Sequence, residues 1–318
     1  MPAAPTSLVA GAARATLLPD VGGAIASFEW RDVDVLRPMP AEARTAGNVR
    51  LAACYPLVPY SNRIRGARLR FDGADHVLTR NFGDHPHAIH GVGWQRRWRV
   101  ERASASGAVM TLEHMARGDD AQAWPWPFHA TQSFDLAVRD ASASLVVTLT
   151  IANTGDTPFP FGLGWHPFFP RDASTMLRFD AREVWRNDAT QLPVERLPAD
   201  GPWNFATSRD PGEGAIDNVF GGWPGVATIA SPAHGLTTKL IADRACDRLV
   251  VYAPPGRDFI AVEPVTHETD AFNRAHDGVP ATGMRVLRPG GAFSCTMRID
   301  VTATLVGNAQ ALRGIASG

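Results

Sequence analysis

Alternation of apolar and polar residues is the feature that most restricts the fold of this chain. From Ala143 to Ile151 every second residue is apolar, and the same pattern runs from Met297 to Leu305. A third stretch, from Phe128 to Val138, also alternates, with Gln132 as the exception on its apolar face. Because successive side chains of a strand point to opposite faces, this period indicates strands with one buried face. Few windows show a helical period, so we expect little helix.

Further short strands are predicted between the glycines and prolines that punctuate the chain. The 29 glycines and 25 prolines are spread throughout, and neither a low-complexity linker nor a fixed-period repeat is visible. Many short strands joined by turns predict an all-β fold, a large antiparallel β-sandwich. We expect residues 1–318 to form a single domain, with 193–225 as a long irregular insertion near the surface. The additional strands expected are Trp94–Val100, Val226–Ile229, Gly235–Ala242, Arg248–Tyr252 and Phe259–Glu263.

The composition argues against several classes of protein. A formal net charge of −1 leaves no basic excess to neutralise phosphates, so no nucleic-acid partner is expected. Lys239 is the only lysine and follows no glycine-rich loop, which argues against a P-loop. Three cysteines are too few for a disulfide framework and suit a reducing compartment. Residues 1–28 have no uninterrupted apolar core, so we expect no signal peptide, no membrane partner and a cytoplasmic location.

One histidine near the middle of the chain lies in an apolar stretch, Phe161–Pro170, that is interrupted by glycine and proline. Gly162 and Gly164 allow the backbone to approach another group closely. Pro167 disfavours a helical conformation for His166 and indicates an extended or turn conformation. A histidine in this setting is either a proton donor or a packed core residue.

Polar residues in two predicted loops are candidates for ligand contacts. Arg63, which follows Asn62, could hold a hydroxyl or a carboxylate through its forked donors, or form a surface ion pair. The closely spaced His85, His87 and His90 could form a metal site, but no nearby carboxylate completes a cupin-like ligand set. The alternative is that His90, next to Gly91, faces a ligand while the other two histidines are structural.

Two acidic residues are further candidates. Asp217 lies in a glycine-flanked stretch, where it could bond its own backbone in a turn or accept hydrogen bonds from a polyol. Glu263 interrupts an apolar strand, and burying a carboxylate there is costly without partners. Burial raises the pKa of a carboxyl group and makes it a better base near neutral pH. Pro264 is expected to end the strand, which would place Glu263 at the rim of a sheet.

These stretches occur in the order seen in aldose 1-epimerases, and the chain resembles the galactose mutarotase-like family over roughly residues 8–303. The matching groups are Asn62-Arg63, His90-Gly91 followed by Trp94, the run around His166, Asp217, and Glu263-Pro264 followed by Asp270-Ala-Phe-Asn273. The resemblance implies a large antiparallel β-sandwich and the interconversion of α and β anomers of a hexose or related sugar by ring opening and closure. It implies no metal and no cofactor, a small sugar as the partner, and a monomer or homodimer.

By this resemblance Glu263 is the base and His166 the acid, while His90 hydrogen-bonds near the ring oxygen or C1. Arg63 and Asp217 fix sugar hydroxyls. Asn62, Trp94 and Trp165 are the remaining candidates for substrate contacts, since tryptophan faces stack on the apolar face of a pyranose.

The residues around His166 differ from those of galactose-type members, which usually have Asn-His-x-Tyr-Phe, so the resemblance leaves the sugar open. Some members act on phosphorylated or sulfonated sugars, which Arg65, Arg96 and Arg97 could hold if they do not simply form a solvated strand face. Two alternatives remain: a carbohydrate-binding protein without catalysis, and a cupin-like metal enzyme.

Overall fold

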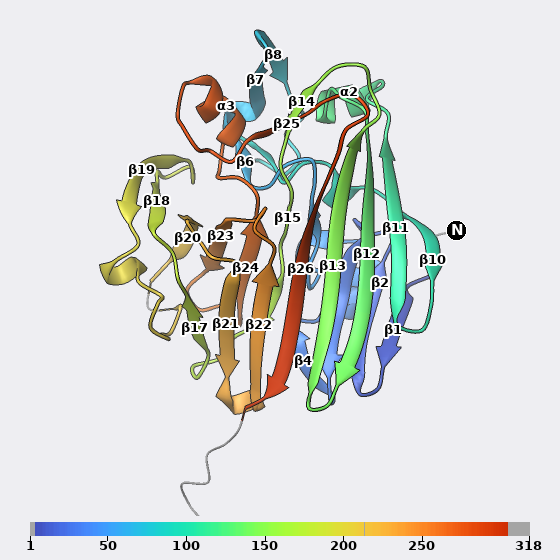
Figure 1. Ribbon diagram of the computed structural model, residues 1–318, viewed down its shortest axis with the longest axis vertical. Coiled ribbons are helices and arrows are strands. Elements are labelled where there is room, and N and C mark those ends of the chain that lie inside the picture. Colours follow the sequence, from blue (N-terminus) through green and yellow to red (C-terminus); the bar gives the residue numbers. More distant parts are fainter. Residues whose placement is uncertain (1–3, 213, 305–318) are drawn as a thin grey trace, which may run out of the picture.

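The computed structural model describes residues 4–212 and 214–304 and consists mainly of antiparallel sheets in two layers (Figure 1). The first large sheet contains, in spatial order, β10 (Arg99–Ala103), β11 (Gly107–His114), β12 (Phe128–Arg139), β13 (Ser142–Asn153), β26 (Ala292–Ala303), β22 (Leu236–Ala242), β21 (Val226–Ser231) and β17 (Met176–Phe179). The second contains β19 (Pro193–Pro198), β18 (Glu183–Asn187), β20 (Ile216–Gly221), β23 (Arg248–Ala253), β24 (Phe259–Val265), β15 (Gly164–Trp165) and β5 (Pro56–Leu57), with β16 (Phe168–Pro170) also paired to β24.

Smaller elements surround these two sheets. The N-terminal sheet contains β1 (Thr6–Ala10), β2 (Ala13–Leu18), β3 (Ala24–Trp30) and β4 (Val33–Leu36). Three short pairs are β6 (Arg63–Ile64) with β9 (Ala88–Ile89), β7 (Arg68–Phe71) with β8 (Ala74–Val77), and β14 (Phe159–Phe161) with β25 (Arg285–Leu287). The helices are α1 (Ala41–Thr45), α2 (Asp119–Ala123) and α3 (Ala271–His276), with 3-10 turns at Val49–Leu51, Arg65–Ala67, Gly93–Gln95, Gly201–Trp203 and Pro232–His234. None of the helices in 4–212 and 214–304 is long and apolar enough to cross a membrane.

The alternating stretches form the centre of the first sheet, as predicted. On β13 the alternate residues Ala143, Leu145, Val147, Leu149 and Ile151 are all buried, and they pack in one core with buried residues of β24 on the second sheet. Gln132, the exception on β12, is buried and donates from Nε2 to the carbonyl of Gly23 at 3.0 Å. That bond satisfies its amide and links the first sheet to the N-terminal sheet. Leu305, at the end of the predicted stretch that begins at Met297, lies outside the described residues.

Two predictions about the elements are wrong. The expected strand from Trp94 to Val100 begins instead with a 3-10 turn, and β10 starts at Arg99. There the indole of Trp98 donates to the carbonyl of Gly93 at 2.9 Å, a local bond that competes with strand pairing. Residues 193–225 are not an irregular insertion, because they contain β19 and also β20, which lies between β18 and β23 inside the second sheet.

Pro264 does not end its strand, and Glu263 therefore does not lie at a rim. On either side of Pro264 the N–H groups of Val262 and Thr266 donate to the carbonyls of Pro167 and Leu163, at 3.3 and 2.9 Å. Pro264 removes only the donor between them, a loss that the flanking bonds of the ladder tolerate. Since Gly164 pairs with Val265 and Phe168 with Ala261, the same register places His166 opposite Glu263.

Candidate active site

A cavity of about 440 Å³ opens on the second sheet, and six of the predicted site residues line it. Its size lies within the range of about 300–1,000 Å³ that is usual for small-molecule sites. The six residues come from the loops before β6 and after β9, from the turn between β15 and β16, and from β20, β24 and β6. They are Asn62, Arg63, His90, His166, Asp217 and Glu263.

The centre of the cavity holds a directly paired carboxyl and imidazole. His166 Nε2 lies 3.3 Å from Glu263 Oε1, as expected for side chains at opposite positions of paired segments in one sheet. Both residues are buried. Glu263 Oε2 and His166 Nδ1 have no hydrogen-bond partner within the protein, although most buried polar atoms do. The two residues that carry these atoms line the cavity.

Burial determines the protonation of this pair. It raises the pKa of Glu263 well above its ordinary value, with repulsion from Asp217 adding to the rise and Arg63 opposing it. Burial also lowers the pKa of His166 to about 3, helped by the positive charges of Arg37 and Arg63. Near neutral pH the pair therefore favours a protonated carboxyl beside a neutral imidazole. That state carries the same number of protons as a carboxylate beside an imidazolium, so one proton can serve at either position.

Arg63 connects two of the other candidates. Its Nη1 donates to Asn62 Oδ1 at 2.9 Å, and its Nη2 lies 3.2 Å from Asp217 Oδ2. Both partners in this ion pair are largely shielded from solvent, with side chains 16% and 24% exposed, so the surface-ion-pair hypothesis for Arg63 does not hold. Asp217 is not a turn residue either, because it lies on β20 opposite Tyr252 of β23.

The backbone fixes the orientation of His90. Asn62 and His90 both have left-handed backbone conformations, with φ of 54° and 63°, and such strain in non-glycine residues is concentrated at functional sites. The His90 N–H donates to the Asn62 carbonyl at 2.8 Å, and the Asn62 N–H donates to His90 Nδ1 at 3.0 Å. Since Nδ1 accepts, neutral His90 carries its proton on Nε2. Burial lowers the pKa of His90 well below its ordinary value, and His166 and Arg63 lower it further.

Of the other two histidines of the proposed metal cluster, His85 lines the cavity with His90, and His87 lies outside the lining. His87 Nδ1 accepts from the Gly66 N–H at 3.0 Å, and His85 Nδ1 lies 3.3 Å from the His87 N–H. Within 4–212 and 214–304, no three His, Cys, Asp or Glu side chains are grouped as metal ligands. The geometry gives no support to the cupin-like alternative.

The two glycines before His166 allow the backbone to approach another group closely. That group is a neighbouring segment of the same chain and not a ligand. A Cβ on Gly162 would lie 1.7 Å from the ring of His267, and one on Gly164 would lie 2.7 Å from Val265. The His267 ring in turn accepts from the Ser61 N–H at 3.0 Å through Nε2. The sequence correctly indicated that side chains would not fit at these positions. The reason is the packing of β15 against β24.

Neither predicted tryptophan lines the cavity. Trp165 is buried in the core between the sheets, because neighbours along an extended chain point to opposite sides and His166 takes the cavity side. Trp94 is buried behind Tyr55 and Phe82, with ring centroids at 5.6 and 5.8 Å. Its indole donates to the carbonyls of Ile89 and Gly91, at 3.3 and 3.2 Å.

Five other aromatic residues form the apolar part of the wall, and the sequence analysis missed all but one of them in this role. Phe168, within the apolar stretch Phe161–Pro170 that contains His166, stacks on that imidazole with centroids 4.4 Å apart. Spacing along the chain gave no signal for the others. The five are Tyr55, Phe82, Phe168, Tyr252 and Phe259.

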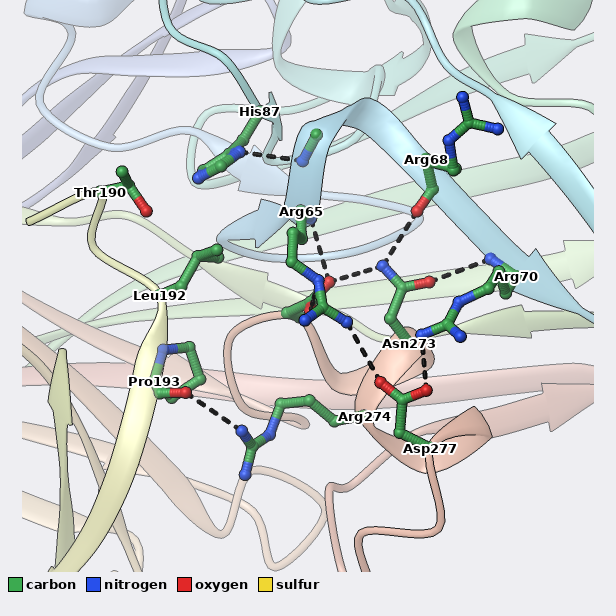
Figure 2. Close-up of polar contacts among 12 residues, drawn as sticks. Arg65, Arg68, Arg70, His87, Thr190, Leu192, Pro193, Asn273, Arg274 and Asp277 are labelled. Carbon is green, nitrogen blue, oxygen red and sulfur yellow. Dashed lines mark hydrogen bonds and ion pairs between the residues drawn. The ribbon is translucent and has the colours of Figure 1, made fainter. Parts of the chain in front are cut away.

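A second polar network holds Arg65, Arg68 and Arg70 against α3 (Figure 2). Buried Asp270 donates its N–H to the Arg63 carbonyl at 2.9 Å, and its Oδ1 accepts from the Arg65 N–H at 3.0 Å. The Asn273 amide contacts both Arg70 N and Arg68 O, at 3.0 and 2.9 Å. The Asp270…Asn273 part of the sequence pattern thus positions the chain that carries Arg63 and does not itself line the cavity.

Comparison with known proteins shows the family and the fold of this chain. A family model described as aldose 1-epimerase matches residues 7–300. The uncharacterized protein YphB of Escherichia coli (strain K12) is 29% identical over 298 residues, which covers 89% of this chain and 93% of YphB.

Solved structures of other proteins are similar in fold to this chain. The crystal structure of a candidate aldose 1-epimerase from Escherichia coli K12 is similar with a TM-score of 0.84 and 25% identity, covering 94% of this chain and 99% of that one. An aldose epimerase homologue from C. elegans is similar with a TM-score of 0.77 and 19% identity, covering 95% and 99%.

Proposed function

Because this chain belongs to the aldose 1-epimerase family, we propose that it is an isomerase that interconverts the α and β anomers of an aldose. Family and fold support a mutarotase-like, sugar-related function. The observation that carries the specific reaction is the buried Glu263–His166 pair, whose 3.3 Å contact and unsatisfied atoms lie in a cavity of the right size for a sugar.

Anomer exchange requires two proton transfers on oxygens bonded to the same carbon. The Glu263 carboxylate removes the proton of the hydroxyl on C1 while the His166 imidazolium gives a proton to the ring oxygen. The bond between C1 and the ring oxygen breaks, and C1 becomes an aldehyde carbon. After rotation about C1–C2, the freed hydroxyl attacks the other face of the aldehyde and returns its proton to His166. The protonated Glu263 gives its proton to the former aldehyde oxygen on C1, which becomes the new hydroxyl, and Glu263 is again a carboxylate.

Adjacency of the two groups suits this chemistry. A carboxyl and an imidazole in direct contact can reach two oxygens that share one carbon. The ring opening turns a carboxylate and an imidazolium into a carboxyl and a neutral imidazole, which is the state that burial favours in the free protein. The low-dielectric site thus stabilises the protonation state of the open-chain intermediate relative to the charged pair.

The remaining polar groups bind and orient. His90 Nδ1 accepts from the Asn62 N–H, which leaves Nε2–H as a hydrogen-bond donor to the sugar. His166 is the proton donor in this proposal because it is in direct contact with Glu263. Arg63 and Asp217 offer donors and acceptors to ring hydroxyls, with the Arg63 Nε still unpartnered within the protein. Apolar faces of the sugar pack on the aromatic wall.

The test is the rate of anomer equilibration for freshly dissolved α-aldoses, followed by polarimetry. The protein should accelerate relaxation, and Glu263→Gln should lower kcat/KM by about 10²–10⁴-fold, because the amide keeps the shape and cannot act as the base. The matched control is Glu113→Gln, an exposed glutamate on β11 of the other sheet, which should leave the rate unchanged.

Two results would count against the proposal. Retention of more than about a tenth of the activity by a folded Glu263→Gln protein would remove Glu263 from its role. Sugar binding by calorimetry without any acceleration would favour the alternative of a carbohydrate-binding protein without catalysis.

A further inference from the structure

The cavity carries more positive charge than the proposed reaction uses. Four arginines line it against two carboxyl groups, although the whole chain has a formal net charge of −1. Arg63 is paired with Asp217. The other three come from separate segments: Arg37 follows β4, Arg50 lies in the 3-10 turn Val49–Leu51, and Arg257 lies in the turn between β23 and β24.

None of these three guanidinium groups forms an ion pair with a carboxylate in the described part of the chain, although the negative charge of Asp258 acts on Arg37. Within residues 4–212 and 214–304, no carboxylate oxygen lies within 4.0 Å of a side-chain nitrogen of Arg37, Arg50 or Arg257. Arg37 donates from Nη2 to the carbonyl of Ala52 at 3.2 Å, and its buried Nε has no partner within the protein. Arg50 and Arg257 are exposed at the opening of the cavity.

Aromatic side chains of the cavity wall hold two of the arginines in place. Arg50 lies over the ring of Phe82 at 3.9 Å, and Arg37 lies over Phe168 at 4.3 Å and over Phe259 at 4.5 Å. Stacking occupies the flat face of a guanidinium and leaves its edge N–H groups able to donate. The arrangement is preorganised for an acceptor in the cavity.

The charges act on the same region. Burial raises the pKa of Tyr55, and the charges of Arg50 and Arg37 oppose that rise. Burial likewise raises the pKa of Tyr252, opposed by Arg257, Arg63 and Arg50. Both tyrosines line the cavity, so the positive potential of the arginines converges on it.

The arginines suggested by the sequence are not the ones that line the cavity. Arg65 pairs with Asp270 and Asp277, and Arg96 pairs with Asp120 at 2.6 Å. Arg97 is exposed and lies outside the lining. A charged substrate would have to be held by the three arginines that only the tertiary structure brings together.

Resting on the proposed function, we propose that the substrate is an aldose with an anionic group outside its hemiacetal, bound by Arg37, Arg50 and Arg257. Sugar hydroxyls both donate and accept, whereas a phosphate or carboxylate of the substrate mainly accepts. A wall with three guanidinium groups that form no ion pair in the described part of the chain matches the second kind of group, through charge-assisted hydrogen bonds. Because Arg50 and Arg257 are exposed at the opening, the anionic group lies there while C1 faces Glu263 and His166.

The experiment compares anomer exchange by proton NMR for three classes of sugar. These are neutral hexoses (glucose and galactose), their 6-phosphates, and the corresponding hexuronates. We expect kcat/KM for one anionic class to exceed that for the neutral hexoses by about tenfold or more. The preferred class identifies phosphate or carboxylate as the recognised group.

Two variants test the arginines without disturbing the core, since Arg50 and Arg257 are exposed. Arg50→Gln and Arg257→Gln should each lower the ratio of anionic to neutral kcat/KM by about tenfold, the loss expected for a charge-assisted hydrogen bond. Arg44→Gln is the matched control. Arg44 is an exposed arginine on α1, outside the cavity lining, and its replacement should leave the ratio unchanged.

The outcomes separate this inference from the proposed function. Equal or better turnover of neutral hexoses, with no change in Arg50→Gln, overturns the anionic substrate and leaves the epimerase standing. If no sugar is turned over, the proposed function fails, and calorimetric binding decides the inference. Binding of an anionic sugar that Arg50→Gln weakens supports it, and absence of such binding overturns it.

Discussion

The central strands of the first sheet and the cavity side of the second sheet follow opposite rules. Strands β12, β13 and β26 are each 12 residues long, pair in continuous register, and bury apolar side chains on one face. Their buried polar residues, Gln132 and Asn153, are both hydrogen-bonded. Local preference, pairing and burial agree in this region, which is the condition for a stable and specific structure.

The cavity side departs from these rules at several points. It buries a carboxyl group and two imidazoles, and it holds Asn62 and His90 in left-handed conformations. Of the eight buried side-chain atoms without a partner in the described part of the chain, half belong to cavity residues Arg37, Arg63, His166 and Glu263. The comparison indicates that the first sheet stabilises the fold. The cavity side of the second sheet holds reactive groups away from water, which lowers stability.

The largest effect we expect separates the two histidines of the cavity. His166→Gln removes the acid and should lower kcat by about 10²–10⁴-fold. His90→Gln removes one neutral donor and should cost only about tenfold. Both rates come from polarimetry, and chemical denaturation should show that both variants stay folded. Equal losses would mean that His90 shares the proton transfer, and the assignment based on its Nδ1 contact would be wrong.

Truncation of a core side chain in the first sheet should lower stability and leave activity unchanged, the reverse of the effect expected in the cavity. Leu149→Ala on β13 removes a fully buried side chain and should lower the free energy of unfolding by about 2–5 kcal/mol. Activity per folded molecule should not change, because the cavity is on the other sheet. Thr150→Ala, on the opposite face of the same strand, is the control and should cost less than about 1 kcal/mol. A large fall in activity of the folded Leu149→Ala protein would show that the two regions are coupled.

The smallest effect concerns pH. Burial lowers the pKa of His166 to about 3 and that of His267 to about 4, so the unfolded chain binds more protons than the folded protein below pH 6.5. The free energy of unfolding should therefore fall as the pH drops from 6.5 towards 4, by at most about 1.4 kcal/mol per pH unit for each histidine.

Glu263 has the opposite sign. Its raised pKa makes the folded protein bind the extra proton, so its contribution is complete below about pH 4.5 and is lost as the pH rises through the folded pKa. Denaturation of the wild type and of Glu263→Gln across pH 4–9 gives the free energy of unfolding as a function of pH. It checks the predicted fall on the acid side (the acid limb) and on the alkaline side (the alkaline limb). We expect the same acid limb in both proteins and a shallower alkaline limb in the variant. Identical alkaline limbs would show that Glu263 is ionised in the folded protein at neutral pH.

Local pattern predicted much of this molecule. Period-two alternation specified the strands around residues 128–151 and 292–303, because side-chain direction in a strand depends only on position along it. The chemistry of the site was also visible as residue types out of place, such as a glutamate in an apolar strand. Both signals lie within short windows of sequence. The order of the motifs along the chain gave the resemblance to the family.

Tertiary structure decided which residues meet. Arg63 and Asp217 pair although they are 154 positions apart, and the register of β24 with β15 and β16 is what sets His166 opposite Glu263. The same register sends Trp165 into the core, and chain packing brings Arg37, Arg50 and Arg257 to one cavity. The sequence by itself determined the strands and the reactive residue types. The composition of the cavity wall depends on contacts between distant segments, which no local pattern encodes.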